Sequence, residues 1–330
     1  MSVASGVGSL PGADSAAYDE ALKLVLDQLP DLPQLPELPG RGATANLTAR
    51  ALAIVAGLGA DLQPAGWRLT DGVGADLRRA RSLLAQDLDA TEEQTQGFQG
   101  RFKIQVAGPW TLAATVERPR GDRVLADHGA RRELAQALAE GLREHVADVQ
   151  RRIPGAQIVV QVDEPALPAV MGGRIPTASG FSRHRSVDNP VASPPLEWVF
   201  AAIAESGAVP VAHCCAADVP ISLLLGAGAE GISVDLGVLP LSSYDDLADA
   251  VERQRLVFLG AVPSTEPASW PGDHELTERV LRLFDMLGLD PHTVGDRLVV
   301  TPSCGLAGAG RPWARRALEL SRTVAANITG

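Results

Sequence analysis

The chain has 330 residues, of which 45% are apolar and 21% are charged, and its formal net charge at pH 7 is −11. This composition is ordinary for a soluble globular protein with enough residues for a large core. The acidic balance argues against broad affinity for nucleic acids or acidic membranes, and we expect neither as a partner.

The amino-terminal segment and the cysteine content bear on the compartment. Residues 1–6 lack the basic and apolar regions of a signal peptide, and no apolar run reaches the length of a membrane span. Three cysteines cannot build a disulfide framework, and in a reducing compartment they favour metal or catalytic thiols. We therefore expect a cytoplasmic protein.

Short apolar runs alternate with amphipathic stretches along the whole sequence. The apolar runs predict strands at Val3–Gly8, Leu62–Trp67, Phe102–Ala107, Gln157–Val162, Val209–Ala212, Gly231–Asp235, Leu256–Ala261 and Leu298–Thr301. The amphipathic stretches predict helices at Ser15–Leu29, Thr44–Gly57, Ala75–Asp87, Arg123–Arg151, Pro195–Ser206, Val219–Gly226, Tyr244–Arg253, His274–Leu287 and Pro312–Ala326. This alternation predicts an α/β fold, a (β/α)8 barrel (TIM barrel) formed by residues 1–330 as a single domain, although a doubly wound sheet gives a similar pattern.

Two stretches interrupt the alternation. The proline-rich segment Asp31–Gly42 predicts a surface crossover rather than a domain linker. Residues 171–195, rich in Gly, Pro, Ser and Arg, predict a long loop after the fourth strand. Loops of that length are uncommon unless they cover a site or are disordered.

Residues that can bind a metal ion follow the predicted strands, where the active site of such a barrel lies. Residues two apart on a strand point to the same side, so His213 and Cys215 converge while Cys214 faces the barrel wall and is structural. Together with Cys304, they offer one imidazole and two thiolates, a set that suits Zn²⁺ with an open position for water or substrate. Each cysteine taken singly is also compatible with simple core packing. The grouping of three favours zinc.

Asp235, at the end of the sixth predicted strand, is the expected fourth ligand. The alternatives are a helix cap or a carboxylate that accepts the other N–H of the His213 ring. All three interpretations place its carboxylate at the rim of the barrel.

Two adjacent carboxylates, Asp163 and Glu164, end another predicted strand. Buried carboxylates are costly without partners, so we expect Asp163 to be catalytic and to bind the ammonium group of an amino-acid substrate. Glu164 is expected to be structural. The alternative is that both are exposed and cap the next turn.

Weaker signals come from the first strand end and from the long loop. Backbone N–H groups of Gly8 and Ser9 are candidates to bind a substrate carboxylate, although an ordinary turn explains them equally well. Arg183, His184 and Arg185 are best interpreted as a solvated charge run, with contact to an anionic substrate as the alternative.

Together these residues resemble the catalytic domain of cobalamin-independent methionine synthase, in the superfamily of uroporphyrinogen decarboxylase and the corrinoid-dependent thiol methyltransferases. The specific matches are the DEPAL sequence at Asp163–Leu167 and the proline-x-cysteine-glycine-leucine sequence at Pro302–Leu306. The segments Gly8–Pro11 and His213–Cys215 are also similar to motifs of that family. The similarity spans nearly the whole chain.

The resemblance implies a zinc-dependent (β/α)8 barrel that transfers a methyl group to homocysteine and so makes methionine. It implies that Asp163 binds the homocysteine amino group and that the Gly8-Ser9 segment holds the carboxylate. It also implies that His213, Cys215 and Cys304 bind zinc.

The sequence departs from the family pattern at four points. The fourth zinc ligand of the family is a glutamate, and Asp235 stands in its place. The acidic homocysteine-binding motif after the second strand is not recognisable around Gln63–Trp67. The aspartate-isoleucine-histidine segment after the seventh strand is missing from Gly260–Glu266, and the N-terminal folate-binding barrel of the full-length enzyme has no counterpart in these 330 residues.

These departures bear on the methyl donor. They favour a methyl-corrinoid, carried by a corrinoid protein, or another activated donor over methyltetrahydrofolate. Two alternatives remain open for the activity: a zinc- or thiol-binding barrel that acts as a sensor or carrier without turnover, and a decarboxylase or lyase of the same superfamily. The three zinc-type ligands speak against a metal-free decarboxylase.

Overall fold

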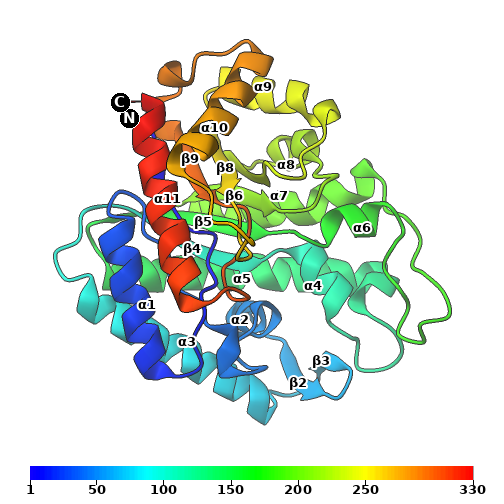
Figure 1. Cartoon of the computed structure of the whole chain (residues 1–330). Helices are drawn as coiled ribbons and strands as arrows, with labels where there is room; N and C mark the ends of the chain where they lie inside the picture. Colours follow the sequence, from blue (N-terminus) through cyan, green and yellow to red (C-terminus); the bar gives the residue numbers. More distant parts are fainter. Residues whose placement is uncertain (330) are drawn as a thin grey trace.

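The computed structural model describes residues 1–329, which form a curled parallel sheet surrounded by helices (Figure 1). The strands of this sheet are β1 (Val3–Ala4), β4 (Gly100–Ala107), β5 (Ala156–Asp163), β6 (Val209–Cys214), β7 (Gly231–Asp235), β8 (Leu256–Val262) and β9 (Leu298–Pro302). The helices are α1 (Ser15–Gln28), α2 (Leu47–Ile54), α3 (Ala75–Gln94), α4 (Pro109–Thr115), α5 (His128–Arg152), α6 (Leu167–Met171), α7 (Asn189–Glu205), α8 (Ile221–Gly226), α9 (Tyr244–Glu252), α10 (Asp273–Leu287) and α11 (Arg311–Thr329). Single 3-10 turns lie at Pro39–Arg41, Val124–Ala126, Leu241–Ser243, Pro291–Thr293 and Gly295–Arg297.

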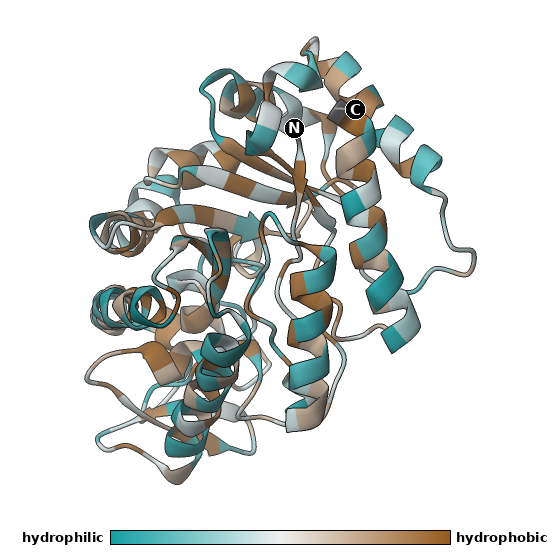
Figure 2. Cartoon of the chain, turned by 90° about the vertical axis from the view of Figure 1, so that its left-hand side faces the viewer, coloured by the Kyte–Doolittle hydropathy of each residue, from teal (hydrophilic) through white to brown (hydrophobic). Residues whose placement is uncertain are grey.

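The sheet follows the order β1-β9-β8-β7-β6-β5-β4, and every neighbouring pair is parallel. Parallel strands with helices on the outer face need apolar side chains on that face, and the outward residues of the central strands are fully buried. Figure 2 shows the surrounding helices with hydrophilic and hydrophobic stripes, as expected of helices that cover a sheet. The predicted (β/α)8 type of fold is confirmed.

The prediction of a barrel strand at Leu62–Trp67 is wrong. Strands β2 (Gly59–Gln63) and β3 (Gly66–Thr70) instead form an antiparallel hairpin that is separate from the curled sheet. The physical reason is the turn between Gln63 and Gly66, which pairs the two halves of the segment with each other.

The segment Leu32–Leu38 takes the place of that strand, so the prediction of a surface crossover at Asp31–Gly42 is also wrong. This segment is buried and bridges the two ends of the sheet. On one side, Leu35 N–H donates to the Lys103 carbonyl and Lys103 N–H donates to the Pro33 carbonyl, both at 2.8 Å. On the other side, Glu37 pairs with the residues after β1: its N–H donates to the Gly8 carbonyl at 3.2 Å, and its carbonyl accepts from Leu10 N–H at 2.8 Å. The prolines remove backbone donors, and for this reason the segment does not look like a strand in the sequence.

The loop predicted over residues 171–195 is shorter than expected. Helix α6 ends at Met171 and α7 begins at Asn189, so the irregular segment covers residues 172–188. Pro190 lies in the first turn of α7, where a missing N–H costs nothing, but Pro194 and Pro195 lie inside the helix. These prolines made the first turns of α7 look irregular.

The interior of the barrel is apolar at one end and polar at the other. Apolar side chains form a separate buried cluster toward the amino ends of the strands: Val3, Leu32, Val159, Val211, Phe258 and Val299. Residues two positions further along a strand point to the same side, and there the sequence has Gln161, His213 and Thr301. Hydrocarbon therefore fills the base of the barrel, and polar groups gather toward the carboxyl ends of the strands.

The lengths and compositions of the helices bear on membrane insertion. Within residues 1–329, no helix combines the length and the apolar character needed to cross a bilayer.

Candidate metal centre

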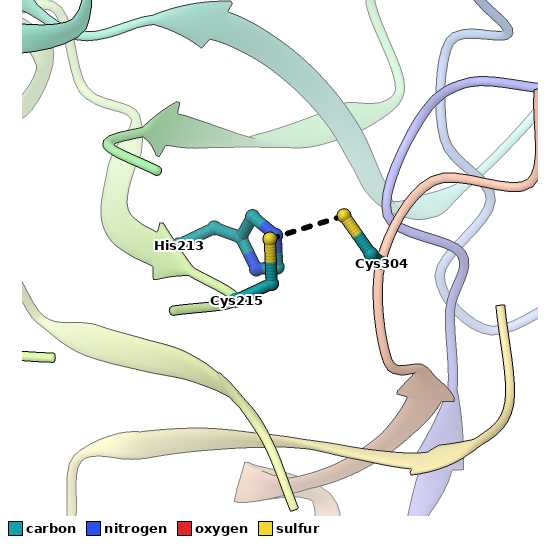
Figure 3. Close-up of side chains that lie close together, drawn as sticks. All are labelled: His213, Cys215 and Cys304. Carbon is teal, nitrogen blue, oxygen red and sulfur yellow. Dashed lines mark hydrogen bonds between the residues drawn. The ribbon is translucent and has the colours of Figure 1, made fainter. Parts of the chain in front are cut away.

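His213, Cys215 and Cys304 come together at the carboxyl ends of β6 and β9. One possible ligand atom from each residue lies within 4.8 Å of the others, and the two sulfurs are 3.1 Å apart (Figure 3). His213 is in β6, Cys215 follows that strand directly, and Cys304 follows β9, 89 positions later in the chain. The fold therefore brings together the imidazole and the two thiols singled out from the sequence.

One nitrogen of the His213 ring is left free by its surroundings. The Ser233 hydroxyl on the neighbouring strand β7 lies 2.8 Å from Nδ1. The other nitrogen, Nε2, is buried and has no hydrogen-bond partner among the described residues. A buried polar atom without a partner is costly, and an imidazole held through one nitrogen presents the lone pair of the other to a metal ion.

The two thiols influence each other because they share a hydrogen bond. This bond, together with the nearby His213 ring, lowers the pKa of the Cys304 thiol, whereas sharing with Cys304 and burial raise the pKa of the Cys215 thiol. Two sulfurs that compete for one proton in a partly buried site are well suited to lose their protons to solvent when a metal cation binds.

Cys214 behaves differently from its neighbour Cys215. It is fully buried and belongs to the main hydrophobic core, where burial raises the pKa of its thiol to about 12. Because side chains alternate along β6, Cys214 packs in the core and Cys215 lies at the candidate metal site.

Asp235 lies at the end of β7, but its carboxylate is turned to its own loop. Oδ1 accepts a hydrogen bond of 2.7 Å from Gly237 N–H, and the group of mutually close ligand atoms contains no atom of Asp235. Burial raises the pKa of Asp235, and Arg279 acts in the opposite direction. In this conformation the carboxylate caps the turn after β7.

A cavity of about 320 Å³ opens beside the three possible ligands. Its wall contains residues from distant parts of the chain, among them the segment after β1, Glu37, Gln105, Asp163 and the cysteine-bearing ends of β6 and β9. A volume of this size is at the lower end of the range for small-molecule sites. It fits an amino-acid-sized substrate next to the sulfurs.

Asp163 faces this cavity from the end of β5. Its Oδ1 accepts a 2.7 Å hydrogen bond from the Gln161 amide, and among the described residues no other group donates to its carboxylate. Burial raises the pKa of Asp163 to about 7, whereas His213 and Lys103 act to lower it. The remaining oxygen of this carboxylate is therefore available to a ligand.

Glu164, next in the chain, points away from the cavity and caps α4. Its carboxylate accepts hydrogen bonds from Trp110 N–H at 2.9 Å and from the N–H and hydroxyl of Thr111, both at 2.7 Å. A Cβ on Gly108 would lie 2.4 Å from Glu164 Oε1, so glycine is needed there for this close approach. The carboxylate satisfies the free N–H groups of the helix start.

Glu37 is a site residue that the sequence did not reveal. It lies in the buried segment Leu32–Leu38 that occupies the second strand position, it lines the cavity, and its Oε1 accepts from Arg50 Nε at 3.1 Å. An acidic side chain therefore lines the cavity from the second strand position, about 25 residues before the segment where one was expected. A lone carboxylate between apolar residues in an otherwise uncharged stretch is the signal that could have identified it.

Gly8 and Ser9 lie against the loop that carries Cys304. The Leu306 N–H donates to the Ser9 carbonyl at 2.8 Å, and a Cβ on Gly305 would lie 2.1 Å from Ser9 Oγ. Within residues 1–329, the N–H groups of Gly8 and Ser9 donate no hydrogen bond, and both residues line the cavity. Two backbone N–H groups at the cavity wall are therefore without an acceptor in the described part of the chain.

Comparison with known proteins identifies a family that the sequence matches. The sequence model of the family described as the cobalamin-independent synthase catalytic domain matches residues 93–327. No curated protein sequence matches the chain.

Solved structures share the fold at low sequence identity. A B12-independent methionine synthase from a Shewanella species, solved with selenomethionine, aligns with a TM-score of 0.65 at 14% identity, covering 98% of this chain and 97% of that chain. A β-mannanase from the blue mussel Mytilus edulis aligns with a TM-score of 0.49 at 12% identity, covering 98% and 92%, and supports no functional argument. Because the family match spans most of the chain, the protein belongs to the cobalamin-independent synthase catalytic-domain family, and it is a methyltransferase.

Proposed function

We propose that the protein binds Zn²⁺ through His213, Cys215 and Cys304 and methylates the thiol of homocysteine or a close analogue. The observation that carries this proposal is the convergence of two thiols and an unpartnered imidazole nitrogen on one point beside a cavity. One nitrogen and two sulfur ligands with an open position are typical of zinc sites that act on a substrate.

Zinc supplies one chemical effect at such a site, because a thiol that coordinates it loses its proton and becomes a nucleophile. The residues of the chain hold and orient the groups at the site. The Ser233 hydroxyl holds the His213 ring, and the two cysteines would hold the metal at the wall of the cavity. We further propose Asp235 as an additional ligand, which has to exchange its present hydrogen bond to Gly237 for the metal.

Two carboxylates in the cavity wall support an amino-acid substrate. We propose that Asp163 and Glu37 receive its ammonium group, because both line the cavity and Asp163 has a free oxygen. The unused N–H groups of Gly8 and Ser9 are suited to its carboxylate. A thiol at the end of a short side chain then reaches the sulfur ligands within the same 320 Å³ cavity.

The residues around the cavity also bear on the donor. His213 is the only imidazole in the cavity wall among the described residues, and it is assigned to the metal. The loop after β8 contributes Ser264, which contacts Ser303, and no histidine. We therefore propose a donor whose leaving group needs no proton, such as a methyl-corrinoid, in preference to methyltetrahydrofolate. A carrier or sensor without turnover remains the second candidate, favoured by the same missing histidine.

Zinc binding is tested by changing the ligands. His213→Ala and Cys304→Ser should hold less than about one tenth of the zinc of the wild type, because each removes a ligand from a three-residue set. Cys214→Ser is the matched control, since this neighbouring cysteine faces the core, and it should keep about one ion per chain. Metal analysis of proteins purified without chelator gives the numbers. Full zinc in either ligand variant contradicts the assignment.

The roles of the adjacent carboxylates are tested by substrate selectivity. Asp163→Asn should weaken homocysteine binding about 10- to 100-fold, because it removes a charge-assisted hydrogen bond. It should not affect 4-mercaptobutanoate, which lacks the amino group. Glu164→Gln should lower the free energy of unfolding by about 1–3 kcal/mol without changing this selectivity. Binding is measured on Co²⁺-substituted protein by the thiolate absorption, and an unchanged preference in Asp163→Asn refutes its proposed role.

The donor is identified by following methionine formation from homocysteine. We expect the zinc-loaded protein to use methylcobalamin and to give no product with methyltetrahydrofolate. Product from methyltetrahydrofolate alone overturns the donor proposal. Tight homocysteine binding with no product from either donor supports the carrier or sensor.

A further inference from the structure

A second and larger cavity lies at the same end of the barrel as the metal centre. It measures about 660 Å³ and is lined by the loop after α4, the first turn of α5 and the loop between α6 and α7. Both loops follow carboxyl ends of strands, those of β4 and β5, and therefore belong to the functional rim of the barrel (Figure 1). The titratable residues in its wall are Asp122, Arg131, Arg183, His184, Arg185 and Asp188.

The surroundings of this cavity differ in charge from the rest of the protein. Residues 118–132 and 172–188 together contain eight arginines and three aspartates, although the whole chain has a net charge of −11. Such a local excess of positive charge in an acidic protein attracts anions to this part of the rim.

Two of the three aspartates in these segments are already engaged, whereas the Asp188 side chain in the wall does not cap α7. The Asp122 carboxylate lies 3.4 Å from His184 Nε2 and accepts hydrogen bonds from the backbone N–H groups of Arg123 and Ala178, both at 2.8 Å. Asp127 caps α5 through Ala130 N–H and pairs with Arg118. These contacts fix the two loops to each other but leave the arginines of the wall without carboxylates.

Arg131 is the most informative of these arginines. Its guanidinium stacks over the Trp110 ring at 5.5 Å, and its Nε is buried without a hydrogen-bond acceptor. Its one polar contact is with His128 Nδ1 at 3.5 Å, and within residues 1–329 neither Arg131, Arg183 nor Arg185 forms an ion pair. Among the described residues, Asp127 is the one carboxylate that acts on the Arg131 charge, and it pairs with Arg118 instead. A partly buried guanidinium whose Nε has no acceptor is costly unless a ligand supplies one.

We propose that this cavity is a binding site for a small polyanion whose phosphate or carboxylate groups pair with Arg131, Arg183 and Arg185. The guanidinium group is planar and donates two parallel hydrogen bonds, which matches both kinds of anion. Asp188 in the wall leaves the lining net positive. This site is separate from the proposed zinc and thiol site, because its lining shares no residue with that of the metal cavity.

Calorimetric titration of the zinc-loaded protein tests this proposal, with pyrophosphate and citrate as the two probes. The probe that binds more tightly distinguishes a phosphate from a carboxylate ligand. Arg131→Gln combined with Arg183→Gln should weaken that binding at least tenfold, because two charge-assisted contacts are lost. The matched control is Arg311→Gln with Arg315→Gln, which removes two arginines from another cavity and should leave the affinity unchanged.

Two results overturn the proposal. One is the absence of binding by either probe up to about 10 mM, a concentration at which even weak charge-assisted sites are occupied. The other is an equal loss of affinity in both double variants, which indicates only a general electrostatic attraction.

An independent observation concerns Lys103, which is fully buried inside the barrel beneath the metal cavity. Its Nζ donates to the Val7 carbonyl at 2.9 Å and to Gln161 Oε1 at 2.8 Å. Gln161 in turn donates from Nε2 to Val7 O at 2.9 Å and to Asp163 Oδ1 at 2.7 Å. Lysines are almost never fully buried unless they are paired, so the burial of Lys103 needs a structural or functional explanation.

The hydrogen-bonding chemistry of Lys103 and Gln161 explains this burial. An ammonium group only donates hydrogen bonds, so the oxygen of the Gln161 amide has to face Lys103. The NH₂ group of the same amide then has to face Asp163. We infer that Lys103 is a positioning residue that locks the amide of Gln161 and thereby holds Asp163 toward the cavity. This inference rests on the proposed role of Asp163 as the ammonium ligand.

The test replaces Lys103 with methionine, which has a similar length but no donor. Homocysteine binding should weaken about tenfold, whereas 4-mercaptobutanoate binding and zinc content should remain at wild-type values. Gln161→Met should give the same loss of selectivity, and the double variant should add nothing further because both changes break one chain of contacts.

The possible failures can be told apart. A wild-type protein without preference for homocysteine refutes the role of Asp163 and this inference with it. A preference that persists in Lys103→Met, or an equal loss for both thiols, overturns the role of Lys103 alone.

Discussion

The parallel register of β5, β6 and β7 decides where chemistry can occur in this barrel. Backbone hydrogen bonds place Asp163 opposite His213 and His213 opposite Ser233, so a carboxylate, an imidazole and a hydroxyl lie in one row across three strands. A slip of β6 by one residue would turn His213 outward and bring Cys214 inward, because side chains alternate along a strand. The site therefore depends on the sheet itself, and the loops complete it.

Much of this fold could be predicted because buried parallel strands appear as apolar runs. Seven such runs correspond to β1 and β4 through β9, within a few residues at each end. The eighth position could not be predicted, because Pro33 and Pro36 interrupt the backbone donors of Leu32–Leu38 and the segment makes only isolated bridges. The nearby segment Leu62–Trp67 had the expected composition, but it pairs with itself as a hairpin. Local composition does not reveal which partner a strand chooses.

The candidate site, like the fold, has one part that the sequence predicted and another part that it did not. The alternation along β6 predicted that His213 and Cys215 meet, and the strand-end rule added Cys304. Glu37 was not identified because its segment was not predicted to be a strand. The hydrogen bond of Asp235 to Gly237 depends on the geometry of the loop, which the sequence does not show. Lys103 and Gln161 were visible as polar residues at inward positions of apolar runs, a pattern that signals a polar barrel interior.

The pairing of β1 with β9 has a consequence for how the protein is made. Val3 lies beside Val299, so the first strand has to wait for its neighbour until almost the whole chain has been synthesised. Contacts between such distant parts of the sequence slow folding, and open sheet edges attract other chains in the meantime. Because Cys304 lies two residues after the end of β9, the last strand of the sheet also brings the second cysteine of the site. The closing of the sheet and the pairing of the two thiols therefore both wait for the carboxyl-terminal part of the chain.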